Sequence, residues 1–66
     1  MQIQLNGAAR EVADNITLST LIETLELGAK RIAIEVNEEL VPRTQHGEHL
    51  LRPGDRVEIV QAIGGG

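Results

Sequence analysis

The chain of 66 residues contains no cysteine, phenylalanine, tyrosine or tryptophan. Without cysteine, a disulfide, a thiolate metal site and a catalytic thiol are all excluded. Without aromatic side chains the hydrophobic core must be aliphatic, and the apolar content of 41% is enough for one small core. A chain of this size buries only about 60% of the surface that its unfolded state exposes, so we expect a single domain.

Long apolar runs and an excess of positive charge are also missing. No apolar stretch approaches the roughly 18 residues of a membrane-spanning helix, and the N-terminus lacks the apolar segment of a signal peptide, so we expect no membrane association and a cytoplasmic location. Ten acidic residues against six basic ones give a net charge of −4, which argues against nucleic acid as a partner. The acidic surface is consistent with a basic protein partner or simply with solubility.

The first half of the chain predicts a hairpin followed by a helix. Residues 1–5 alternate polar and apolar side chains, and Asn6-Gly7 is typical of a type I′ turn, whose central residues need positive φ. Residues 8–13 would form the return strand, with Val12 as its main core residue. Apolar side chains then recur at helical spacing and predict a helix over residues 18–27: Leu18, Leu21, Ile22 and Leu25.

Both ends of this helix carry recognisable signals. Thr17 is expected to cap the N-terminus, where Ile16 and Leu21 would form a hydrophobic staple. Gly28 would take the left-handed conformation that ends the helix.

The second half of the chain predicts three strands. Residues 32–37 alternate again, Glu38-Glu39 is turn-like, and residues 40–42 would form a short strand that ends at proline. A polar connection over residues 44–51 would tuck Leu50 and Leu51 under the sheet. The sequence Arg-Pro-Gly-Asp at 52–55 predicts a tight turn before the last strand.

The resulting order β-β-α-β-β-β predicts an α+β domain, a mixed four- to five-stranded sheet packed on one helix. The first and last strands are expected to be central neighbours, and the other sheet face stays open with Gln2, Gln4 and Glu58 on it. The domain would span residues 1–63, followed by a flexible tail at 64–66.

The chain stops at Gly64-Gly65-Gly66, directly after the strand-like run at 56–60. Terminal glycines contribute no packing and lose much conformational freedom when ordered. A tail without side chains is, however, thin enough to enter a narrow channel, and three residues reach about 10 Å when extended. We interpret it as a segment that presents the carboxylate of Gly66 to another protein's active site. The alternative is a frayed terminus or a cloning remnant.

A family resemblance is carried by three segments: residues 37–43 (Asn-Glu-Glu-Leu-Val-Pro-Arg), residues 52–60 (Arg-Pro-Gly-Asp-Arg-Val-Glu-Ile-Val) and the end, Ala62-Ile63-Gly64-Gly65-Gly66. The order of elements, with a last strand running into glycines, resembles the β-grasp or ubiquitin-like fold. The motifs resemble the ThiS family, bacterial sulfur carrier proteins of thiamine thiazole synthesis, over essentially the whole chain. His46 departs from the pattern, since many relatives carry an aromatic residue there.

The resemblance implies a protein substrate rather than an enzyme. A partner related to ubiquitin-activating enzymes would adenylate Gly66 with ATP and Mg²⁺, while Gly64 and Gly65 enter its active site. A persulfide-bearing sulfur donor protein would then create a thiocarboxylate, which delivers sulfur to thiazole synthase. No phosphate-binding loop is present, so this chain is expected to bind no cofactor itself. A carrier for molybdopterin or another metabolite, a ubiquitin-like modifier and a plain interaction module stay open as alternatives.

Two further groups of residues have competing interpretations. Val60, Ala62 and Ile63 interrupt the alternation and would either form an apolar docking patch with Glu58 or partly complete the core. The histidines of His46-Gly-Glu-His49 lack a third zinc ligand and the helical geometry to meet, so we expect them in a surface loop and no metal site. We also expect a monomer.

Overall fold

The computed structural model describes residues 1–28 and 30–61. Ala62 and all the predictions that fall on residues 62–66 lie outside the described residues. The elements of the described part follow each other in the predicted order: β1 (Gln2–Leu5), β2 (Ala8–Glu11), α1 (Leu18–Thr24), β3 (Ile32–Val36), β4 (Glu39–Val41), the 3₁₀ helix η1 (Arg43–Gln45) and β5 (Arg56–Gln61). Only η1 has no counterpart in the sequence-based prediction.

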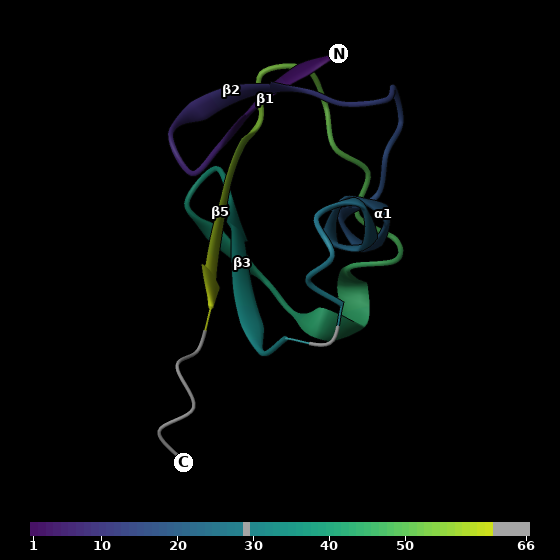
Figure 1. Cartoon of the computed structure of the whole chain (residues 1–66), viewed down its shortest axis with the longest axis vertical. Coiled ribbons are helices and arrows are strands. Elements are labelled where there is room, and N and C mark those ends of the chain that lie inside the picture. Colours follow the sequence, from purple (N-terminus) through teal and green to yellow (C-terminus); the bar gives the residue numbers. More distant parts are fainter. Residues whose placement is uncertain (29, 62–66) are drawn as a thin grey trace.

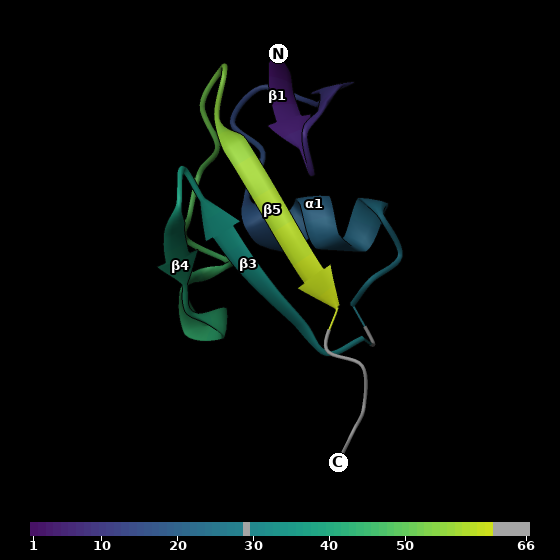
Figure 2. The ribbon, with the colours of Figure 1, turned by 90° about the vertical axis from the view of Figure 1, so that its left-hand side faces the viewer.

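The strands form one five-stranded mixed sheet in the order β2-β1-β5-β3-β4. β5 lies in its centre, parallel to β1 and antiparallel to β3. The prediction that the first and last strands are neighbours is therefore confirmed. Figure 1 shows α1 on one side of the sheet, and in Figure 2 the helix lies behind β5, so the opposite face carries no helix.

The core between α1 and the sheet is aliphatic, as the missing aromatic residues require. Alternation along each strand and the helical stripe deliver these side chains to one place. The buried apolar residues are Ile3, Ile16, Leu18, Leu21, Ile22, Ile34, Val36, Val41, Leu51 and Val57. The open face carries the exposed polar residues Gln2, Gln4 and Glu58, as predicted.

The first hairpin and the N-terminus of α1 form as the sequence predicts. Asn6 and Gly7 both adopt positive φ, at 50° and 84°. The hydroxyl oxygen of Thr17 accepts a hydrogen bond of 3.1 Å from the backbone N–H of Thr20, which is the predicted cap. β2 ends at Glu11, earlier than predicted, although the N–H of Val12 still donates to the carbonyl of Met1 at 2.8 Å.

The C-terminus of α1 differs from the prediction. The helix ends at Thr24, and Glu26 rather than Gly28 takes the left-handed conformation, with φ of 60°. The N–H of Leu27 donates to the carbonyl of Ile22 and that of Glu26 to Glu23, which is the Schellman pattern of a helix end. The stop comes early because this arrangement brings Leu27, a partly buried residue, against the core.

The second hairpin also turns one residue earlier than predicted. Val36 pairs with Glu39, so the two-residue loop is Asn37-Glu38, with φ of 52° and 70°. Positive φ at both central positions defines a type I′ turn, and Glu39 begins β4 instead of belonging to the turn. After η1, Leu51 is buried as predicted, but Leu50 is 53% exposed, so only one of the two leucines lies under the sheet.

Candidate functional site

The site predicted from the sequence lies where β5 leaves the sheet. On one side, β1 pairs with β5 only up to Leu5 opposite Val57. The chain then turns, and the side-chain oxygen of Asn6 accepts a hydrogen bond of 2.8 Å from the backbone N–H of Ile59. On the other side, pairing with β3 continues to Ile32 opposite Gln61, the last residue that the structure describes. Backbone and side-chain hydrogen bonds thus hold β5 in place up to Gln61.

The residues predicted to dock a partner fall on both sides of this limit. Glu58 is exposed and Val60 is 63% exposed. Alternation with the buried Val57 puts both on the sheet face that α1 does not cover, the face of β5 turned to the viewer in Figure 2. Ala62, Ile63 and the glycines at 64–66 lie outside the described residues. The docking role of the patch therefore stays a prediction, as does the role of the tail.

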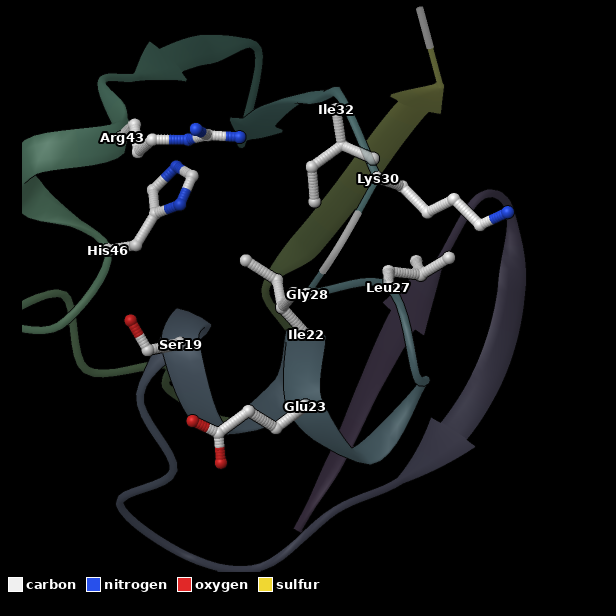
Figure 3. A pocket seen from close by; sticks show the side chains of 9 residues that line it. All are labelled: Ser19, Ile22, Glu23, Leu27, Gly28, Lys30, Ile32, Arg43 and His46. Atoms are coloured by element: carbon white, nitrogen blue, oxygen red, sulfur yellow. The ribbon is translucent and has the colours of Figure 1, made fainter.

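A shallow cavity of about 210 Å³ lies on the helix side of the sheet, between α1, η1 and the start of β3 (Figure 3). Arg43 and His46 line it from η1 and the residue after it, and Ser19 and Glu23 line it from α1. A second cavity of about 300 Å³ opens between the end of α1 and the end of β5, lined mainly by leucine and isoleucine. Ser19 and His46 both line the first cavity, but in the described residues the Nε2 of His46 lies against the carbonyl oxygen of Val41 and not against the Ser19 hydroxyl.

His46 is buried, which contradicts the expectation of a surface loop. Its side chain is 6% exposed, and its Nε2 lies 3.0 Å from the carbonyl oxygen of Val41. Since a carbonyl oxygen only accepts, Nε2 carries the proton and donates. The residue pattern at 44–51 did not predict this burial, because the contact joins two elements, the loop and β4.

His49 serves the fold in a different way. The backbone carbonyl oxygen of His49 accepts a hydrogen bond of 3.1 Å from the N–H of Leu18. The backbone carbonyl oxygen of His46 likewise accepts a hydrogen bond of 3.1 Å from the N–H of Ser19. With the Thr17 cap, these bonds occupy the N–H groups that open the helix. Within residues 1–28 and 30–61, no three His, Cys, Asp or Glu side chains are arranged to hold a metal ion.

One further charged cluster surrounds the amino terminus. The Met1 ammonium lies 2.9 Å from Glu11 Oε2 and 3.1 Å from Asp14 Oδ1, and it donates to the carbonyl of Val12 at 2.7 Å. The hydrogen bond to Glu11, followed by that to Asp14, raises the pKa of the ammonium above its usual value of 8.0. This cluster ties the end of β2 to the first residue, and sequence reasoning did not find it.

Comparison with known proteins places this fold and its glycine end in one family. The model of the ThiS family matches residues 3–66. The sulfur carrier protein ThiS of Escherichia coli K12 is 35% identical over 66 residues, which cover all of both chains. The crystal structure of the thiamine biosynthesis protein (ThiS) from Geobacter metallireducens superposes with a TM-score of 0.86 at 28% identity, again over all of both chains.

A longer relative matches as well. The thiazole synthase of Paramagnetospirillum magneticum is 33% identical over 66 residues, and this chain spans 20% of its length. In the described part, no helix has the length and apolar character to cross a membrane. The match over nearly the whole chain and the shared fold confirm the resemblance drawn from the sequence: the chain belongs to the ThiS family.

Proposed function

We propose that this protein is a sulfur carrier of thiamine biosynthesis and that it carries the sulfur on the carboxyl group of Gly66. The observation that carries the proposal is the match to the ThiS family over residues 3–66, with 35% identity to a sulfur carrier protein along its full length. The chain acts as a substrate of other enzymes.

The chemistry begins with activation of the terminal carboxylate. A carboxylate reacts poorly with nucleophiles because its negative charge makes the carbonyl carbon a weak electrophile. Attack of a carboxylate oxygen of Gly66 on the α-phosphate of ATP gives an acyl-adenylate and releases pyrophosphate. ATP and Mg²⁺ belong to the activating partner, an enzyme of the ubiquitin-activating type, and AMP becomes the leaving group of the next step.

Sulfur then replaces the adenylate. The terminal sulfur of a persulfide on a donor protein attacks the acyl carbon, and AMP leaves with the electron pair of the broken C–O bond. A second thiol cleaves the S–S bond of this acyl disulfide, is itself oxidised to a disulfide with the donor, and releases the thiocarboxylate of Gly66. The thiocarboxylate is a nucleophile, suited to hand its sulfur to an acceptor.

The acceptor in this proposal is thiazole synthase. Two proteins of that name match this chain over its full length, and in each the matching part is 20% of the protein. A carrier segment joined to thiazole synthase would deliver its sulfur at high effective concentration, which supports the same pairing for this chain.

The fold provides a rigid base for this chemistry. β5 is the central strand and is bonded to β3 up to Gln61, so the five residues that follow begin from a fixed point. Glycines at 64–66 offer no side chain that a narrow channel of the partner would have to accommodate. The body of the domain would stay outside the channel while Gly66 reaches the adenylation site.

Intact mass spectrometry tests the proposal. Incubation with the adenylating enzyme, ATP and a persulfide donor is expected to replace one terminal oxygen by sulfur. A chain that lacks Gly65 and Gly66 is the negative control and is expected to keep its mass. Gly65→Ala tests the channel, because we expect normal folding with slower adenylation. An unmodified wild-type chain under these conditions would contradict the proposal, and covalent adducts with other proteins would indicate a modifier instead.

A further inference from the structure

Two glutamates face each other on the sheet face that α1 leaves open. Glu35 of β3 is directly opposite Glu58 of β5, and both side chains are exposed. In an antiparallel pair, directly opposite Cβ atoms lie about 4.5–5.5 Å apart, so two like charges at these positions destabilise the sheet. Arg56 shares this face, but its guanidinium forms an ion pair with Glu38 at the hairpin turn, with Nη2 4.0 Å from Oε1.

Exposed apolar side chains border this acidic pair. Val60, two residues after Glu58 on the same face, is 63% exposed and lies opposite Ala33. Leu40 of β4 is 66% exposed and lies opposite Glu35. Of the three large hydrophobic residues that are exposed in the described part, two therefore border the glutamates, and Leu50 is the third. We call the surface formed by Glu35, Glu58, Val60 and Leu40 the acidic face.

We propose that the acidic face docks the enzyme that adenylates the tail, and that this enzyme places an arginine or lysine side chain between Glu35 and Glu58. The inference rests on the proposed function and names the chemistry by which the activating partner is recognised. One cation would neutralise the repulsion between the two carboxylates, while apolar groups around it would cover Val60 and Leu40.

Position supports this occupant as well as charge. Val60 directly precedes Gln61, the last described residue, and the tail follows it in the sequence. An enzyme that grips Gly66 must lie close to this end of β5, because the residues from 62 to 66 span at most about 18 Å when extended. Figure 2 shows β3, β4 and β5 from the side that α1 does not cover, and strand alternation puts the acidic face on that side.

The proposal predicts opposite effects on folding and on binding. Removal of one carboxylate relieves the repulsion, so the free protein becomes more stable. The same change takes a counter-charge from the cation of the partner, so the complex becomes weaker, chiefly at low ionic strength. A surface that only keeps the protein in solution would leave binding unchanged.

The test measures the Kd of the adenylating enzyme for Glu35→Gln and Glu58→Gln at low and high salt, with the melting temperature of each free variant. Glu48→Gln is the matched control, because it makes the same change of net charge at an exposed position outside the acidic face. We expect each face variant to raise Kd about two- to fivefold at low salt and to raise the melting temperature. The control is expected to change neither value.

A second pair of variants tests the apolar border. Val60→Ala and Leu40→Ala are expected to raise Kd, and Leu50→Ala, which removes an equally exposed leucine from another surface, is expected to leave it unchanged. Wild-type affinity in both glutamate variants would overturn the inference. Equal weakening by Glu48→Gln would overturn it too, because net charge alone would then explain binding.

Failure of this inference is separable from failure of the proposed function. The mass of the terminus is measured in the same samples at saturating enzyme. If the wild-type chain gains sulfur while the face variants bind like the wild type, only the docking inference is wrong. If the wild-type chain gains no sulfur, the proposed function itself is contradicted.

Discussion

The two faces of the sheet have opposite chemistry, as the neighbouring strands β3 and β5 show. On β3 and β5, Ile34 and Val57 point into the core and are almost completely buried. Their sequence neighbours Glu35 and Glu58 point the other way and are exposed. Because successive side chains of a strand alternate between faces, one residue step separates the determinants of stability from the surface offered to a partner. Substitutions on the two faces should therefore affect different properties.

The largest expected effect compares two valines of β5. Val57→Ala removes two methyl groups at a position that is 1% exposed, so we expect the free energy of unfolding to fall by about 2–3 kcal/mol. Val60→Ala makes the same change where the side chain is 63% exposed, and a fall below about 0.5 kcal/mol is expected. Urea denaturation measures both values. Equal losses would show that the two faces do not differ as described.

The next prediction concerns Asn6, whose side chain accepts a hydrogen bond from the backbone of β5. Asn6→Ala removes the acceptor of the Ile59 N–H and puts alanine at a φ of 50°, so a loss of about 2 kcal/mol is expected. Asn6→Gly loses the acceptor but tolerates the backbone conformation, and we expect about half that loss. Hydrogen exchange of the Ile59 amide should accelerate in both variants. Unchanged protection of that amide would contradict the role of Asn6.

A smaller change in stability, of opposite sign, is expected from a substitution at the end of α1, the helix that covers the inner face of the sheet. Glu26 holds a φ of 60°, where a residue with a Cβ is strained, so Glu26→Gly is expected to stabilise the protein by about 0.5–1 kcal/mol. Glu23→Gly makes the same change inside α1 and should destabilise it by about 1 kcal/mol. Thermal denaturation separates the two, and a loss of stability in Glu26→Gly would contradict the described helix end.

The smallest effect belongs to the ammonium of Met1, at the edge of the sheet. The pKa of this ammonium is raised in the folded state. Its contribution to the free energy of unfolding is therefore complete below the unfolded pKa near 8.0, and it disappears as the pH rises through the folded pKa. We expect Glu11→Gln to lower the stability at neutral pH and to match the wild type well above pH 8.0. Denaturation at both pH values checks this, on protein with a free amino terminus. A difference that persists at high pH would indicate another role for Glu11.

Prediction from the sequence succeeded where a local pattern has one physical solution. Asn6-Gly7 predicted its turn because both residues tolerate positive φ, and Thr17 predicted its cap because its hydroxyl reaches the N–H of Thr20. Prediction failed at Gly28, because the end of α1 depends on where Leu27 meets the core. It also failed at His46, whose partner on β4 is a tertiary contact.

The candidate site was predicted only in part, and its docking role stays a prediction. Glu58 and Val60 were proposed because they precede the glycine tail in the sequence. Glu35 was missed, although alternation placed it on the open face, because the sequence did not predict that the strand at residues 32–36 lies beside β5 or in what register. Only the pairing of β3 with β5 shows that Glu35 is opposite Glu58.

By itself, the amino-acid sequence determined the aliphatic core, the order of the elements, the two-layer architecture and the family with its glycine end. These follow from composition, from periods of two and 3.6 residues, and from motifs, all of which are properties of near neighbours in the chain. The tertiary structure decided where α1 stops, that His46 is buried and that two like charges meet on the open face. Each of these depends on contacts between separate elements of the structure, whose free energy overrides local preference.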